Sequence, residues 1–493
     1  MENKTFTTAL WSESLEELKD LGQTVQGTVS YKGSGGLDLE IPLGCLIDRE
    51  PVNDVVVHGI EPINRTCVFG LSQDGKYYTL RDVTTPGPGF SAPGFEQETL
   101  SGRSMLVTHT PIEPNPIIDL LNIRLTGLRE WVGRKPSSET STFSESGDET
   151  TEFRIASEDI RDYTLFECEE AKVVIRYSGR RAGGPIPSYQ FSYTDDYLLQ
   201  IALPKGDVSL DEAIEGWCLP LWNFLSFCMG FRGSILSISF RTGGSHISGD
   251  YYLPLVDGVA SPTDSMFCEM PIPFSSVEDD AQAYIFKWLS FKDYALQAAN
   301  RTVSLTGNWQ MPIDLLFLAS ANAFEASSRI NAESKEMDKE TFQKYLALIK
   351  KSISDEKVNR WAIGKLSTSN FVTATQLAKH LLKQLGEFSD YIVPDRKRFL
   401  YDHRVARNSY THMTGISDST ILTDEDLYHH AKAVQLLTYG AVMLALGMEP
   451  ERILTAFQAS RYRWSDVYYA RQMYARGHGG KSAQADNQAS QRL

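Results

Sequence analysis

The chain has 493 residues and a formal net charge of −15, with 48 Lys and Arg against 63 Asp and Glu. This length exceeds one ordinary hydrophobic core, so we expect two or three domains. Residues 301–493 carry five more basic than acidic side chains, whereas residues 1–300 carry twenty more acidic than basic ones. This uneven distribution of charge excludes a protein that coats nucleic acid along its whole surface. We expect any anionic ligand to bind the second part of the chain.

The sequence predicts a cytoplasmic protein without a membrane partner. It contains no apolar run of about eighteen residues, the minimum for a transmembrane helix, and its first residues lack the basic-then-apolar layout of a secretory signal. The six cysteines show no CxxC spacing. Thiols in such a pattern fit a reducing compartment and small core positions, and they indicate no structural zinc.

The first half of the chain is rich in predicted strands. Short segments with β-branched and aromatic residues alternate with Gly, Pro and Asp. These segments are 24–33, 37–44, 53–60, 66–72, 76–83, 104–110, 153–157, 171–179, 188–194, 197–204 and 234–242. One helix is expected among them, from an N-cap at Ser209 or Asp211 to about Cys228. Residues 136–152 are polar and acidic, which predicts a disordered loop.

From about Val277 the helical period dominates. Asp338 and Thr423 have the positions of N-caps, Gly447 that of a helix end, and Pro450 that of a first helical turn. Phe342, Tyr345, Leu346 and Ile349 are expected to form one apolar face of a helix. The expected helices cover 277–290, 291–303, 312–332, 338–353, 370–386, 395–414, 423–446 and 450–459.

These patterns predict an α+β protein. A β-rich, sandwich-like region covers residues 1–275, and an all-α helical bundle covers 276–460. A basic and aromatic tail covers 461–493, where arginines alternate with tyrosines and a tryptophan. Such a tail can stack on single-stranded bases, or it can form a last helix whose aromatic side chains pack on the bundle.

The helix at 395–414 contains the stretch RNSYTH, which begins at Arg407. At about 100° per residue, its apolar stripe passes through Phe399, His403, Ala406, Tyr410 and Met413. Arg407 lies on the flank of this stripe, and Asn408 and His412 lie roughly opposite it. His403 is therefore assigned to packing or to a local hydrogen bond. The simplest alternative is that Arg407, Asn408 and His412 are ordinary solvated residues of an amphipathic helix.

An arginine and a histidine together supply the chemistry of transesterification at an RNA phosphate. Arg407 stays charged and offers donors that match phosphate, and His412 can take or give a proton near neutral pH. Because one histidine cannot act on both sides of a phosphate at once, we expect a two-fold dimer with two such helices in one cleft. No metal or cofactor is needed, and we expect none. His429 and His430 are better explained as packed or solvated side chains than as a zinc site.

RNSYTH resembles the R-N-x-x-x-H motif of HEPN ribonuclease domains, and PIDLLFLASANAFEASSRI resembles their first helix. The segments GTVSYKG, VHGI and DEAIEGWCLPLWNFLSFCMG are similar to the N-terminal region of ApeA-like abortive-infection proteins, so the resemblance covers nearly the whole chain. It implies an anti-phage endoribonuclease that acts as a HEPN homodimer without metal. An unknown phage-derived trigger is expected to act on the N-terminal region.

The resemblance also implies roles for individual residues. Arg407 corresponds to the phosphate and transition-state binder, His412 to the general acid and base, and Asn408 to the residue that orients them. Glu325, Arg404 and Thr411 are added as candidates for substrate binding. The substrate class is RNA, with tRNA loops as the favoured target because cleavage needs splayed nucleotides.

Two other classes of function stay open at this point. In the first, the α domain only dimerises or holds RNA, and the protein binds a ligand without catalysis. In the second, the β-rich region is a carbohydrate-processing or lectin-like sandwich, for which strand content and aromatic residues are the only support. Loss of RNA cleavage on replacement of His412 distinguishes the enzyme from both alternatives.

Overall fold

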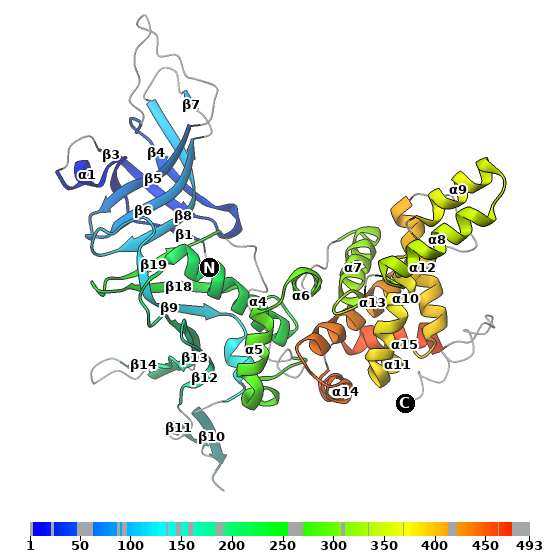
Figure 1. The fold of residues 1–493 in the computed structure, drawn as a ribbon. Helices are drawn as coiled ribbons and strands as arrows, with labels where there is room; N and C mark the ends of the chain where they lie inside the picture. Colours follow the sequence, from blue (N-terminus) through cyan, green and yellow to red (C-terminus); the bar gives the residue numbers. More distant parts are fainter. Residues whose placement is uncertain are drawn as a thin grey trace, which may run out of the picture. The chain divides into compact units, whose positions relative to one another are not determined.

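The computed structural model describes residues 3–20, 24–46, 63–85, 89–90, 96–134, 137–143, 149–155, 161–183, 191–194, 196–254, 270–306, 311–333, 335–367, 369–412, 422–461 and 463–475. The chain divides into two compact units, one of residues 1–267 with 272–286 and one of residues 268–271 with 287–493 (Figure 1). The first unit is rich in strands and the second is helical. The predicted α+β class, with a β-rich part followed by an all-α part, is confirmed.

Six antiparallel strands of the first unit close into a barrel. They are β2 (Ala9–Ser12), β3 (Val25–Tyr31), β4 (Leu37–Ile41), β5 (Ile63–Ser72), β6 (Tyr77–Thr85) and β8 (Glu96–Thr108). Pairing runs from β2 through β3, β4, β8, β6 and β5 and returns to β2. Alternate side chains fill the interior, among them Trp11, Val29, Leu39 and Leu80. This barrel is more closed than the sandwich-like arrangement that the strand pattern predicted.

Strand β8 continues past the barrel into an open antiparallel sheet. The further strands, in spatial order, are β19 (Ser248–Tyr252), β18 (Ile235–Thr242), β9 (Ile117–Leu125), β16 (Tyr197–Ala202), β13 (Lys172–Tyr177) and β12 (Tyr163–Glu167). Helix α4 (Leu219–Met229) follows a short helix that begins at Ser209, whose hydroxyl accepts from the Glu212 amide in a capping box. The prediction of Ser209 as an N-cap is confirmed.

Residues 137–143 and 149–152 lie in strands, whereas their composition predicted a disordered loop. Strands β10 (Ser137–Phe143) and β11 (Glu149–Ile155) pair as an antiparallel hairpin. Threonines are frequent in both strands, and β-branched side chains favour extended backbone even in a polar segment. The predicted strand at 53–60 lies outside the described residues.

The helical unit is built around α13 (Asp424–Ala445), which is buried along most of its length. Asp338 and Thr423 cap their helices by accepting from the amides of Thr341 and Asp426, and Gly447 has a φ of 96° after the end of α13. These caps confirm the predicted helix ends. The helices of this unit are α6 (Asp293–Leu305), α7 (Ile313–Ser328), α8 (Lys339–Ser352), α9 (Glu356–Leu366), α10 (Ala374–Gln384), α11 (Gly386–Ile392), α12 (Arg396–His412), α13, α14 (Pro450–Ala459) and α15 (Trp464–Ala475). Most of α5 (Ala281–Leu289) belongs to the first unit.

Gly440 brings α13 and α11 close together. A Cβ atom added at Gly440 lies 2.2 Å from the ring of Phe388, which is fully buried. We expect Gly440→Ala to lower the free energy of unfolding by about 1–3 kcal/mol, because the packed ring cannot move aside. The matched control is Gly364→Ala in α9, where nothing lies within 4 Å of the added atom; helix propensity should make it neutral or stabilising by up to about 1 kcal/mol. Urea unfolding of both variants checks this, and equal midpoints would contradict it.

Candidate active site

Helix α12 carries the RNSYTH motif and packs by its apolar stripe on α7. Phe399 and Ala406 are buried. The rings of His403 and Tyr410 lie 6.1 Å and 5.8 Å from the ring of Phe317 in α7, measured between centroids. The predicted stripe is therefore confirmed for these four residues of α12; Met413 lies outside the described residues.

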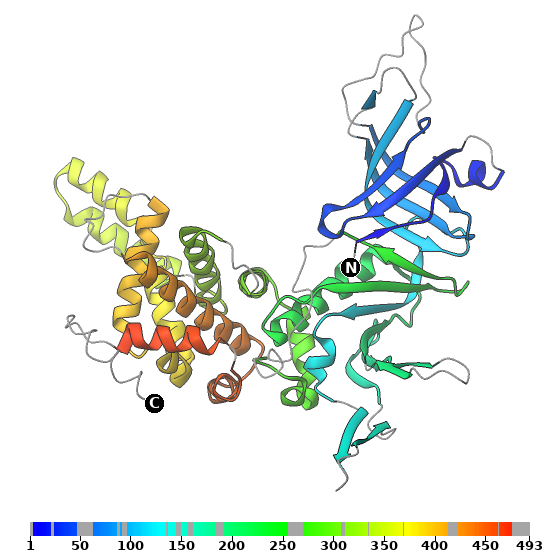
Figure 2. The ribbon, with the colours of Figure 1, turned by 180° about the vertical axis from the view of Figure 1, so that it is seen from behind.

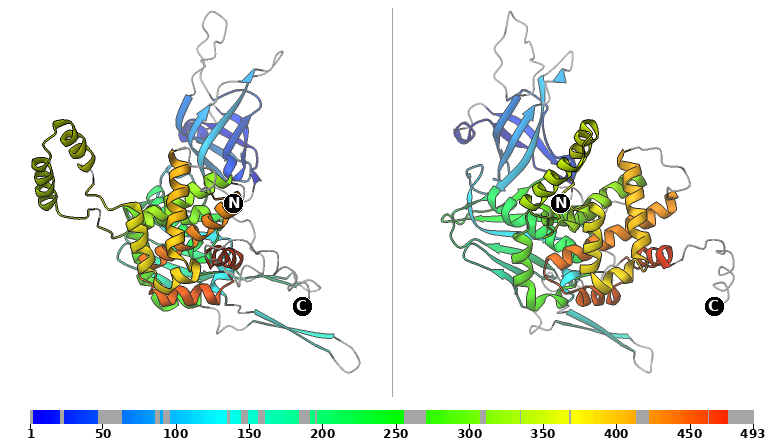
Figure 3. Two further views of the ribbon diagram at one scale, coloured as in Figure 1. Left: turned by 90° about the vertical axis from the view of Figure 1, so that its right-hand side faces the viewer. Right: turned by 45° about the vertical axis from the view of Figure 1, so that its right-hand side comes forward.

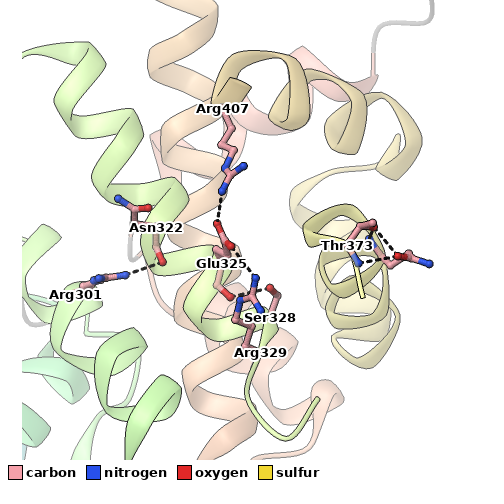
Figure 4. Close-up of polar contacts among 8 residues, drawn as sticks. Arg301, Asn322, Glu325, Ser328, Arg329, Thr373 and Arg407 are labelled. Atoms are coloured by element: carbon pink, nitrogen blue, oxygen red, sulfur yellow. Dashed lines mark hydrogen bonds and ion pairs between the residues drawn. The ribbon is translucent and has the colours of Figure 1, made fainter. Parts of the chain in front are cut away.

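Packing of α12 on α7 brings Arg407 onto Glu325. The Arg407 Nη2 donates to Glu325 Oε2 at 3.0 Å, and Arg329 Nη2 donates to Glu325 Oε1 at 2.9 Å (Figure 4). Burial opposes ionisation of Glu325, but the hydrogen bond from Arg329 and the charges of both arginines outweigh it. The pKa of the Glu325 carboxyl therefore lies below its ordinary value. One carboxylate thus fixes the direction of the Arg407 guanidinium.

A cavity of about 220 Å³ opens beside this ion pair. Its wall contains four residues that the sequence singled out: Glu325, Arg404, Arg407 and Asn408. Further lining comes from His403 and Leu400 on α12, Phe324 and Ser328 on α7, and Ala374, Thr375 and Ala378 on α10. Three helices therefore surround a space that offers cationic and amide donors on one side and apolar groups on the other.

The remaining predicted residues lie at the end of α12. Thr411 is exposed and does not line the cavity. His412 is the last residue of α12, and its side chain lies outside the described residues. Arg404 lies over the ring of Tyr401, 5.7 Å from its centroid, so its charge stays at the rim. The structure thus places Glu325, Arg404, Arg407 and Asn408 around one cavity and leaves Thr411 apart from it.

The cavity can bind an anion. Arg407 retains an exposed fraction of 36% in its side chain, and Glu325 is its hydrogen-bond partner among the described residues. A guanidinium has five N–H donors, so those not directed at Glu325 can serve a phosphate oxygen. Arg404 adds a second cation one turn earlier on the same helix. These donors fit a phosphodiester better than an uncharged ligand.

A hydrogen-bonded chain that the sequence did not predict links α12 to α13 and α15. His430 and Tyr474 are buried, and His403 is partly buried. His403 Nδ1 lies 3.2 Å from His430 Nε2 in α13, and His430 Nδ1 lies 2.5 Å from the hydroxyl of Tyr474 in α15. Figure 2 shows α13 and α15 from the side opposite to Figure 1. The sequence predicts packing or a local hydrogen bond for His403; the observed partner, His430, lies 27 residues further along the chain. The sequence offered one indication that His403 lies near the candidate site: it precedes Arg407 by four residues, and this spacing puts both on the same side of the helix.

Burial keeps this chain uncharged. Burial and the charge of Arg407 lower the pKa of His403 to about 4, against a smaller opposite effect of Glu325. Burial and the neighbouring His403 hold the pKa of His430 well below its ordinary value. Burial raises the pKa of the Tyr474 hydroxyl well above 10. In two neutral imidazoles and a neutral phenol, each group can donate one hydrogen bond to the next. Polar contacts therefore join α12, α13 and α15 without a buried charge.

Helix α15 occupies the start of the predicted tail. Val467, Ala470 and Tyr474 are buried against the bundle. Trp464 and Tyr469 remain exposed, and the ring of Tyr469 stacks on His429 at 4.7 Å. The aromatic residues of this segment thus divide between packing and an open surface.

Comparison with known protein families identifies both parts of the chain. Residues 9–288 match the model of the ApeA N-terminal domain 1, and residues 318–452 match that of the Apea-like HEPN domain. No curated protein and no solved structure matches the chain. Within the described part of the chain, no helix has the length and apolarity to cross a membrane. The first match alone covers more than half of the residues, and together they show that the chain belongs to the ApeA family, with a C-terminal HEPN domain that holds the Arg407 cavity.

Proposed function

We propose that the protein is a metal-independent endoribonuclease of anti-phage abortive-infection defence. The observation that carries the proposal is the cavity where Arg407, held by Glu325, meets Asn408 on the helix that ends in His412. Membership of the ApeA family and the HEPN domain support a ribonuclease role in defence. RNA, with tRNA loops as the favoured target, is the substrate, and the cytoplasm is the compartment.

In the proposed reaction, the ribose 2′-OH attacks the adjacent phosphate. His412 takes or delivers the proton, Arg407 stabilises the charge of the phosphorane, and Asn408 orients these two side chains. The 5′-oxygen leaves with a proton, so the products are a 2′,3′-cyclic phosphate and a 5′-hydroxyl. Side chains supply both proton transfer and charge, and the reaction as proposed uses no metal or cofactor.

A homodimer completes the proposed site. A base and an acid are needed on opposite sides of the phosphate, and one His412 serves only one side. Two copies related by a two-fold axis bring two α12 helices to one cleft, each with its own Arg407. In this proposal residues 276–460 catalyse, residues 1–275 bind an unknown phage-derived trigger and control activity, and the tail at 461–493 supports the HEPN domain.

The chemistry is tested with a defined RNA and the purified full chain. We expect fragments with 5′-hydroxyl and 2′,3′-cyclic phosphate ends, formed equally in the presence of a chelator. The same sequence with a 2′-deoxyribose at the cleaved nucleotide should resist cleavage, because the nucleophile is missing. Cleavage of the deoxy substrate would contradict the mechanism.

The alternative is a protein whose α domain dimerises and binds RNA or another ligand without cleaving it. Arg407→Ala would then weaken RNA binding, and neither protein would form a new RNA end. Sequencing of 5′-hydroxyl ends after expression of the wild type and of Arg407→Ala separates the two functions.

A further inference from the structure

Helices α8 and α9 form an arm, defined here as residues 338–367. None of the arm residues that the structure describes is buried. Figure 3 shows the two helices against each other at the end of two connecting segments. Tyr345, which the sequence placed on the apolar face of its helix, is 52% exposed, because each helix of the arm packs on one partner helix and not on a full bundle. A helix pair with so little burial has surface available for a ligand.

Two hydrogen bonds tie the base of the arm together. The amide of Glu336 donates to the Asn370 carbonyl at 3.0 Å, and Asn370 Nδ2 donates to the Met337 carbonyl at 2.9 Å. Just before the arm, α7 contributes Glu325 and Ser328 to the cavity wall, and just after it α10 contributes Thr375. The arm therefore projects from the two helices that, with α12, enclose the candidate site.

The arm is basic in an otherwise acidic protein. It has seven Lys and Arg against four Asp and Glu, and all seven basic side chains are exposed. Among the described residues only one of the seven, Arg360, has an acidic partner, Glu356. Lysine is depleted from protein–protein interfaces, whereas unpaired lysines are typical of surfaces that bind phosphate. The charge of the arm thus favours a polyanion over a second protein.

Exposed aromatic rings accompany these charges. Trp361 in α9 is 66% exposed, and Tyr345 in α8 is also open to solvent. Bases of single-stranded RNA stack on such rings without regard to sequence, because every base has a π face. Leu348 and Val358 are exposed beside them and can cover the apolar edges of stacked bases. The arm thus presents lysines and aromatic rings together, the combination found on surfaces that bind single-stranded nucleic acid.

We propose that the arm binds a single-stranded segment of the RNA substrate and guides it into the cavity of Arg407. Its lysines contact phosphates, and Trp361 and Tyr345 stack on bases. The proposal rests on the proposed ribonuclease function and adds to it a substrate-binding surface outside the catalytic residues.

The test uses a full-length arm variant with Lys344→Gln, Lys351→Gln and Trp361→Ala. These side chains are exposed, so the fold should be kept. We expect the KM for a long single-stranded RNA to rise about tenfold or more, with kcat unchanged, since stacking of one base and two phosphate contacts are lost. The slope of log affinity against log salt concentration should fall by about 1.4, or about 0.7 for each lysine. The control variant carries Lys287→Gln, Lys292→Gln and Phe286→Ala, which are exposed positions outside both the arm and the aromatic tail.

The outcomes separate this proposal from the ribonuclease function. Unchanged KM in the arm variant, or an equal rise in the control, overturns the arm as an RNA surface while cleavage still stands. If sedimentation shows a dimer for the wild type but a monomer for the arm variant, the RNA-binding role of the arm is also overturned. The arm is then assigned to contact with a second copy of the chain. If the wild type cuts no RNA, the proposed function fails, and binding of a labelled single-stranded RNA to the same two variants decides the arm separately.

Discussion

Replacement of His412 by alanine is expected to lower kcat for RNA cleavage by about 10²–10⁴-fold, the usual contribution of a positioned acid or base. The residue ends α12, and its neighbour Thr411 is exposed, so the helix should stay folded. The measurement is the initial rate at saturating RNA, together with its dependence on pH. The neutral-pH limb of that profile should disappear in the variant, because the titrating imidazole is gone.

The matched control for His412 is His380→Ala. His380 is an exposed histidine on α10 and does not line the cavity. Its loss should leave kcat and the pH profile unchanged. Equal activity of wild type and His412→Ala would remove His412 from the catalytic role and favour a protein that binds RNA without cleaving it.

Acid is expected to destabilise the helical unit through the His403–His430–Tyr474 chain. The pKa of His403 is about 4 in the folded chain and 6.5 without burial, so the unfolded state binds the proton more tightly. Stability is therefore fully present above about pH 6.5 and is lost as pH falls from there toward 4. For His403 alone the loss approaches about 3 kcal/mol, and His430 acts in the same direction.

Urea unfolding followed by helical circular dichroism at several pH values measures this effect. The informative variant is His403→Gln with His430→Gln, which keeps hydrogen-bonding groups but removes both titrating rings. It should be less stable than wild type at neutral pH and should lose much less stability on acidification. A drop in the variant as steep as that in wild type would show that other groups drive acid unfolding.

Local signals in the sequence were sufficient for much of the helical unit. The stripe of Phe399, His403, Ala406 and Tyr410 depends on one repeat within one helix, and so it was predicted correctly. The caps at Asp338 and Thr423 are likewise contacts within three residues. Four of the candidate site residues line one cavity, and three of them, Arg404, Arg407 and Asn408, lie on α12. The helical repeat alone determines how these three are placed relative to one another.

Contacts between distant segments were not predictable in this way. Strand β9 has apolar residues that do not alternate cleanly, and its partners β16 and β18 lie far along the chain. The barrel closes only because β5 returns to β2, a pairing that no single segment encodes. The sequence did not predict helix α9. Its apolar residues pack on one neighbouring helix only, and Trp361 stays exposed, so the helix shows no clear buried stripe.

The support of the candidate site is non-local as well. Arg407 and Glu325 are 82 residues apart, and His430 and Tyr474 are 44 apart. The sequence alone allowed an ordinary role for three of these side chains. Arg407 could be solvated, His430 could be packed or solvated, and Tyr474 could belong to an open tail. Only the packing of α12, α13 and α15 on one another shows which side chains meet.

The hydrogen-bonded chain from His403 to Tyr474 also bears on the order in which the helical unit assembles. Synthesis proceeds from the N-terminus, so α12 and α13 leave the ribosome before α15. Until α15 docks, His430 has no phenol at its Nδ1, and the helix that carries Arg407 lacks the last of its internal supports. A ribonuclease of the proposed kind would be synthesised among ribosomal and transfer RNAs. Under that proposal, we expect the HEPN domain to become active only after α15 docks, so that the nascent chain does not cleave the RNAs that produce it.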